Sequence, residues 1–144
     1  LYNELKQRFD AEIRASGART MLFLTWARAN PSSTQAEITR AYERTGAALQ
    51  VRVAPAGVIW YRLRSRMELF ADVEHPNVTG SYLAACTFFA MLTGQSPVGL
   101  PHHFDAHHVL AEVYRESLDH DRIDAIDAEV IQNAVWEEVR KQLR

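Results

Sequence analysis

Apolar residues recur along the chain with two alternating periods, one helical and one typical of strands. Residues 1–16 carry an apolar side chain at every fourth position, which predicts a helix ended by Gly17. Residues 20–26 (TMLFLTW) are almost continuously apolar, as in a strand buried on both faces of a parallel sheet. Residues 49–53 alternate between apolar and polar side chains, which predicts a strand with one exposed face near a sheet edge.

Helices are expected after each of these strands. Thr34 and Glu37 match a capping box, in which each side chain bonds the other residue's backbone N–H, so a helix is expected from there to Gly46. The remaining elements are expected as a short helix at residues 58–66, a short strand at 67–71, a helix at 78–93 that is apolar nearly all round, and an amphipathic helix at 124–143.

This order of helices and strands implies an α/β fold with a parallel sheet and right-handed crossovers. Two clear strands and one short one are too few for a sheet that five helices would cover. We therefore expect further strands upstream of Leu1, which would make the chain the C-terminal part of one domain. A small helix-rich domain with a minor sheet is the alternative.

Composition narrows the class of protein. The 144 residues are 47% hydrophobic and 24% charged with a formal net charge of -2, as in a soluble globular domain. This near-neutral balance argues against nucleic acid or an anionic membrane surface as the main partner. The single cysteine, Cys86, excludes an internal disulfide and any CxxC metal site. No apolar run reaches the roughly 18 residues of an integral membrane segment, and no cofactor is implied.

The segment Asp72-Val73-Glu74-His75-Pro76 carries the first candidate chemistry. A hydrolase that activates a serine needs an imidazole base and a carboxylate that holds the ring in the right tautomer. Asp72 and His75 meet this need if an irregular turn brings the carboxylate to Nδ1. Pro76 favours such a turn because it pushes His75 out of helical geometry. The same spacing recurs at Asp105 and His108, so a turn residue and a surface histidine are the alternative interpretation.

The longer string at residues 71–101 (ADVEHPNVTGSYLAACTFFAMLTGQSPVGLP) resembles the C-terminal block of the SGNH (GDSL-type) hydrolases, a superfamily of serine esterases and acetylesterases. It is most similar to a bacterial branch in which Asp-x-x-His-Pro precedes a helix of small residues and a Gly-x-x-Pro. Residues 24–27 (LTWA) and 55–64 (PAGVIWYRLR) also look like that branch.

The resemblance implies that Asp72 and His75 are the acid and base of a catalytic triad. It also implies a three-layer α/β/α flavodoxin-like sandwich, with residues 1–101 as its C-terminal part. Residues 102–144 would form a His-rich loop and a helix that packs on the same domain. The family's nucleophilic serine and oxyanion-hole residues lie upstream of this block, so we expect them before Leu1 and expect the fragment alone to be inactive.

The function expected on this basis is hydrolysis of an acyl or acetyl ester, with a small molecule or a carbohydrate as the substrate. The alternative is an SGNH-like fold that has lost catalysis and serves as a binding or interaction domain. None of the chain's own serines has the context of the family nucleophile; Ser81, in particular, is expected inside a buried helix.

Other candidate residues each have a structural alternative. His103 and His107, four residues apart, could share a helix face as a zinc site requires, with Asp105 nearby and His102 and His108 beside them, but a solvated segment is favoured. Cys86 is expected to be a buried apolar residue and Asn77 a helix cap. Trp26 and Trp60 could line a crevice but favour core packing. Arg62, Arg64 and Arg66 favour a surface helix over an anion clamp.

Overall fold

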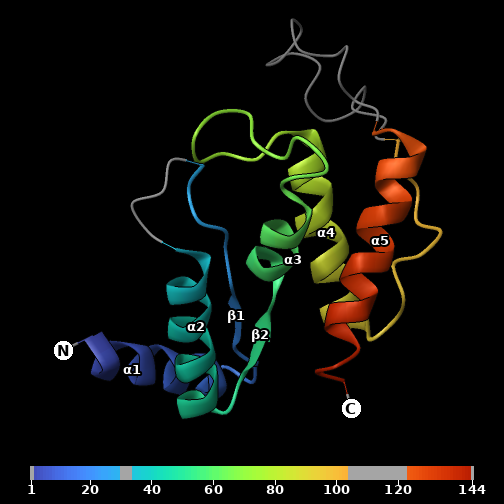
Figure 1. Ribbon diagram of the computed structural model, residues 1–144. Helices are drawn as coiled ribbons and strands as arrows, with labels where there is room; N and C mark the ends of the chain where they lie inside the picture. The colour runs from blue at the N-terminus through green and yellow to red at the C-terminus, as the bar shows by residue number, and fades with distance from the viewer. Residues whose placement is uncertain (1, 30–33, 104–122, 144) are drawn as a thin grey trace, which may run out of the picture.

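The computed structural model describes residues 2–29, 34–103 and 123–143 of the chain (Figure 1). In chain order, the elements are α1 (Tyr2–Ala15), β1 (Met21–Phe23), α2 (Gln35–Leu49), β2 (Arg52–Ala54), α3 (Ala56–Leu63), α4 (Val78–Thr93) and α5 (Ala125–Val139). None of these helices is both long enough and apolar enough to cross a lipid bilayer.

The strands β1 and β2 form a small parallel sheet, with Leu22 opposite Val53. The ladder continues past the strands, because the Leu24 N–H donates to the Ala54 carbonyl and the Gly57 N–H donates to the Leu24 carbonyl. The helix α2 connects the two strands, as a parallel pair requires. The expectation of an α/β chain with parallel strands is therefore confirmed for the described residues.

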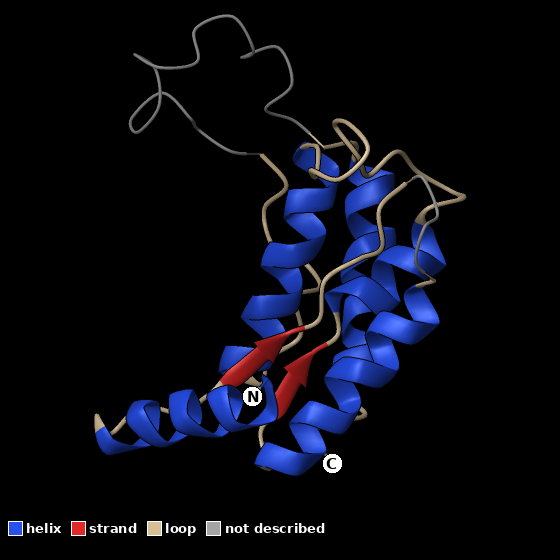
Figure 2. Cartoon of the chain, turned by 90° about the vertical axis from the view of Figure 1, so that its left-hand side faces the viewer, coloured by secondary structure: helices blue, strands red, loops and turns tan. Residues whose placement is uncertain are grey.

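Helices pack on both faces of this sheet (Figure 2). On one face, Leu22 and Val53 meet α2 at Gly46, where a Cβ atom would lie 2.5 Å from Val53 Cγ2. On the other face, the ring of Phe23 lies 4.7 Å from that of Phe88 in α4. Arg52, on the same face, donates to the Met91 carbonyl of α4. The alternation of side chains along β1 thus sets which helix covers which face.

The main core lies between α3, α4 and α5. Its fully buried side chains include Trp60, Leu83, Met91, Ile131 and Val135. The near-continuous apolar sequence of α4 explains its central place, because most of its surface is suited to burial. The last helix, α5, belongs to the same core as α3 and α4.

All three predicted strands differ from those observed. The strand predicted at residues 49–53 spans Arg52–Ala54, because α2 continues through Leu49. Residues 67–71 do not form a strand; a single antiparallel bridge joins Phe70 to Pro76 instead. The first strand covers only Met21–Phe23 of the predicted residues 20–26, because the chain leaves β2 after Leu24 and runs on as an irregular segment.

The ends of three helices also differ from the prediction. The helix α2 continues past Gly46 to Leu49 and ends at Gln50, which adopts a left-handed φ of 55°. Gly46 serves close packing on Val53 instead of ending the helix. The helix α3 spans Ala56–Leu63 instead of 58–66, and α5 spans Ala125–Val139 instead of 124–143.

The first helix, α1, packs least closely. Of its predicted apolar stripe, Leu5 is 41% and Phe9 is 65% exposed. Polar contacts join it to α2: the Arg14 guanidinium donates to the Leu49 carbonyl, and Lys6 Nζ donates to Thr45 Oγ1. The apolar stripe therefore predicted the helix correctly. The Leu5 and Phe9 side chains of that stripe are nevertheless exposed.

Candidate functional site

The turn at residues 72–75 brings Asp72 and His75 into direct contact. Asp72 Oδ1 accepts hydrogen bonds from the backbone N–H groups of Glu74 and His75, both at 2.7 Å. The second oxygen, Oδ2, lies 2.8 Å from His75 Nδ1. An aspartate that bonds the backbone two and three residues ahead forms its own turn, so the contact follows from local sequence.

The electrostatics of the pair determine the tautomer of the imidazole. Hydrogen bonds from the backbone of His75 and Glu74, and then from the imidazole, lower the pKa of Asp72 to about 2. The carboxylate is therefore ionised at neutral pH and can only accept, so His75 Nδ1 carries the donated proton. The same hydrogen bond, with the attraction of the Asp72 charge, raises the pKa of His75 above its ordinary value of 6.5.

The segment at residues 26–29 braces this turn from outside. The Ala29 N–H donates to the Val73 carbonyl at 2.8 Å, and Trp26 Nε1 donates to the Glu74 carbonyl at 3.0 Å. Arg28 forms an ion pair with Glu74 at 2.8 Å. The segment that follows β1 thus holds the turn through three contacts that its sequence spacing does not reveal.

The far end of the turn is fixed at the start of α4. Asn77 caps this helix by accepting from the Gly80 N–H, which confirms the predicted cap. Its amide nitrogen donates to the Glu68 carbonyl, and its backbone N–H donates to the Leu69 carbonyl. Because both ends of the Asn77 side chain are engaged, the structure favours the cap over a substrate contact.

The His75 side chain is accessible: it is 74% exposed, and Asp72 is 52% exposed. With Nδ1 occupied by Asp72, Nε2 on the opposite side of the ring is the nitrogen that can act as a base. None of the described serine hydroxyls bonds to His75. Ser16 donates to the Ile13 carbonyl, and Ser96 accepts from the Val98 N–H. Ser81 is exposed on α4, which corrects the expectation that it is buried.

Of the other candidate residues, the cysteine and the two tryptophans pack in or against the core, and the histidines lie elsewhere. Cys86 is buried, and burial raises the pKa of its thiol to about 11, so it is a protonated core residue, as predicted. Trp60 is buried and stacks on the half-buried Trp26 with ring centroids 4.0 Å apart. The rings of His102 and His103 are tilted by 42° with centroids 4.2 Å apart, whereas Asp105, His107 and His108 lie outside the described residues. Among the described residues, no cluster suited to a metal ion occurs.

The three arginines of α3 and its end do not act together. Arg62 donates to the Ala134 carbonyl and pairs with Glu137 of α5. Arg64 lies over the Tyr61 ring on a different side, and Arg66 is exposed. A clamp made of all three is therefore excluded by their directions.

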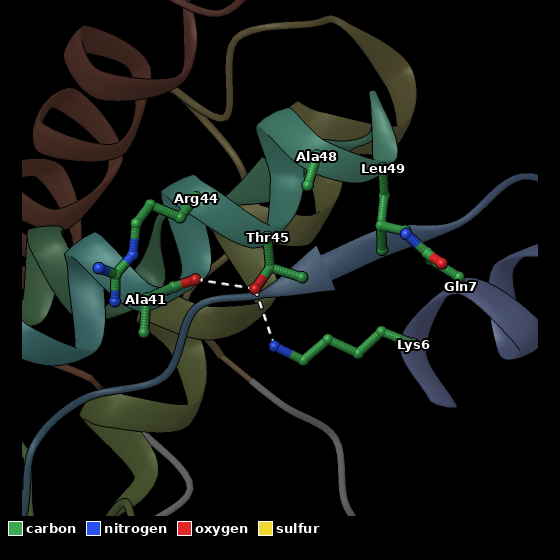
Figure 3. A pocket seen from close by; sticks show the side chains of 7 residues that line it. All are labelled: Lys6, Gln7, Ala41, Arg44, Thr45, Ala48 and Leu49. Carbon is green, nitrogen blue, oxygen red and sulfur yellow. Dashed lines mark hydrogen bonds between the residues drawn. The ribbon is translucent and has the colours of Figure 1, made fainter. Parts of the chain in front are cut away.

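Two of the surface cavities border α2. One, of about 510 Å³, lies between α1 and α2, where Lys6 donates to Thr45 and Thr45 donates to the Ala41 carbonyl (Figure 3). The other, of about 630 Å³, has Arg28 and Ala29 in its wall, and these residues also contact the turn at 72–75. The second cavity is thus the one joined to the Asp72–His75 pair.

The hydrogen bond between the pair predicts a shifted titration. Nuclear magnetic resonance of the imidazole carbons should give His75 a pKa above 6.5, and Asp72→Asn should return it toward that value. Since the folded pKa is the higher one, the contact stabilises the fold fully below about pH 6.5 and less as pH rises through the folded value. A His75 pKa that Asp72→Asn leaves unchanged would contradict the contact.

Comparison with known proteins defines the fold but no activity. No protein-family model and no curated protein matches this chain. Among solved structures, a DUF4886 family protein from Bacteroides uniformis is similar, with a TM-score of 0.65 and 17% sequence identity. The similarity covers 99% of this chain and 58% of that one, so this chain spans little more than half the length of its structural neighbour. At this identity the likeness concerns the fold alone.

Proposed function

We propose that this chain belongs to a serine ester hydrolase of the SGNH type, in which His75 is the general base and Asp72 orients it. The observation that carries the proposal is the 2.8 Å contact between Asp72 Oδ2 and Nδ1 of an accessible imidazole. In the reaction, Nε2 takes the proton of a serine hydroxyl as the hydroxyl attacks the ester carbonyl, and then gives it to the leaving alcohol. The Asp72 carboxylate stabilises the imidazolium formed between these steps.

The proposed fold is the three-layer α/β/α flavodoxin-like sandwich. Two observations support it: helices cover both faces of the sheet, and β1 has an edge without a described strand. Leu24 directs both its backbone groups toward the β2 side, so by alternation Phe23 directs its own toward the open edge. In this fold the nucleophile and the oxyanion-hole donors come from sequence outside these 144 residues.

The test is an assay of the full-length protein with 4-nitrophenyl acetate, combined with labelling by a fluorophosphonate probe. We expect hydrolysis, and labelling of a serine located outside residues 1–144. A protein that neither hydrolyses the ester nor takes the label would contradict the proposal and would favour the alternative, a non-catalytic binding domain of the same fold.

A further inference from the structure

The charged side chains that line the cavity of about 630 Å³ between α2 and α3 all carry a positive charge. Among the residues that the structure describes, its charged side chains are Arg28, Arg40 and Arg64, and none of its lining side chains is a carboxylate. These arginines come from three separate segments: the stretch after β1, the second turn of α2, and the end of α3. Its volume lies in the range typical of sites for small molecules.

The three guanidinium groups differ in how they are engaged. Arg28 is paired with Glu74 at 2.8 Å. Arg64 lies 3.4 Å above the centre of the Tyr61 ring and donates to the Tyr61 carbonyl, contacts that leave its charge without a counter-ion among the described residues. Arg40 is exposed and forms no ion pair within the described part of the chain. Two positive charges at this cavity are therefore not balanced by a carboxylate.

Further donors line the same cavity. Gln35 and Ala36 begin α2. Thr34 accepts from the Glu37 and Ile38 N–H groups, which leaves the N–H groups of Gln35 and Ala36 without an acceptor among the described residues. The helix dipole adds partial positive charge at this end.

The rest of the lining is suited to an apolar body. Phe70 and Val58 line the cavity, and the Phe70 ring packs against Trp60 at 4.8 Å. We propose that the cavity binds a small ring-bearing organic anion, whose carboxylate or phosphate faces Arg40 and Arg64 and whose ring packs against Phe70 and Val58. The proposal concerns binding and does not depend on ester hydrolysis. Arg28 and Ala29, which line the cavity, also contact Glu74 and Val73 of the turn at 72–75.

The test is isothermal titration calorimetry of the full-length protein with phenyl phosphate, inorganic phosphate and benzyl alcohol. We expect saturable binding of phenyl phosphate, weaker binding of inorganic phosphate because it lacks the ring, and no binding of benzyl alcohol because it lacks the charge. Arg40→Gln and Arg64→Gln should each raise the Kd for phenyl phosphate by about tenfold, the effect of one lost charge-assisted hydrogen bond.

The matched control is Arg66→Gln, which removes the same charge two residues from Arg64 but outside the cavity lining. We expect its Kd to stay within about twofold of the parent value, because exposed charges act weakly at a distance. All three arginines are exposed, so circular dichroism should give unchanged spectra. Absence of saturable binding, or an equal loss in Arg66→Gln, would overturn the proposal. Equal affinities for the two phosphates would overturn the role assigned to the ring.

Discussion

The variant His75→Ala should lose ester hydrolysis in the full-length protein, with kcat/KM lower by about 10³-fold or more, the usual cost of removing a triad base. The reason is that no group would remain to take the serine proton during attack. KM should change little, because the imidazole acts on the nucleophile and not on the bound acyl group. The measurement is steady-state hydrolysis of 4-nitrophenyl acetate at several pH values.

Two further variants separate catalysis from structure. Asp72→Asn should also lower kcat/KM strongly, because an amide can donate to Nδ1 and so stabilise the wrong tautomer. His102→Ala is the control: it removes an imidazole outside the turn, one whose ring lies against His103, and should leave the rate within about twofold. Full activity of His75→Ala would show that this histidine is not the base.

The variant Gly80→Ala should lower the free energy of unfolding by about 1–3 kcal/mol, the usual cost of overpacking a core. A Cβ at this position would lie 2.5 Å from Trp60 Cη2 and would collide with the Leu69 carbonyl. Both neighbours are constrained, since Trp60 is buried among the core helices and the Leu69 carbonyl accepts from Asn77. The collision outweighs the gain of up to about 1 kcal/mol that alanine brings to a helix interior.

Urea unfolding followed by circular dichroism measures this effect. The matched control is Ser81→Ala, one residue further along α4 on its exposed side, which should change stability by no more than about 0.5 kcal/mol. A Gly80→Ala protein as stable as its parent would show that α4 does not pack against Leu69 and Trp60 as closely as the structure indicates.

Gly80 also bears on the site. Its N–H donates to the Asn77 side chain, and Asn77 closes the segment that begins at Leu69 and contains Asp72 and His75. A shift of α4 away from Leu69 would therefore loosen the turn. The predicted loss of stability and a reduced shift in the His75 pKa should appear together in Gly80→Ala.

Local signals in the sequence were reliable where the interaction itself is local. The capping box of Thr34 and Glu37 is present, and α4 has the predicted bounds because Asn77 begins it and Gly94, with a φ of 70°, ends it. The contact between Asp72 and His75 forms within four residues. In each case the groups that bond are near neighbours along the chain, so local sequence favours the contact.

Other predictions failed where packing between distant segments determines the local structure. Gly46 looks like a helix end but lies within α2, because Val53 of β2 packs against it and leaves no room for a side chain. Residues 67–71 have the composition of a strand, yet Phe70 pairs only with Pro76. A strand needs a partner along its length, and the pattern of one segment does not say whether a partner is present.

The sequence by itself therefore determined the helices, the parallel pair of strands, and the turn that brings Asp72 to His75. The tertiary structure alone decided which helix covers each face of the sheet, how the segment after β1 braces the turn, and which arginines share a cavity. Arg28, Arg40 and Arg64 stand 12 and 24 residues apart in the chain, and no local pattern links them. They meet because α2 and α3 pack beside the end of β1, and such convergence depends on long-range burial that local spacing does not encode.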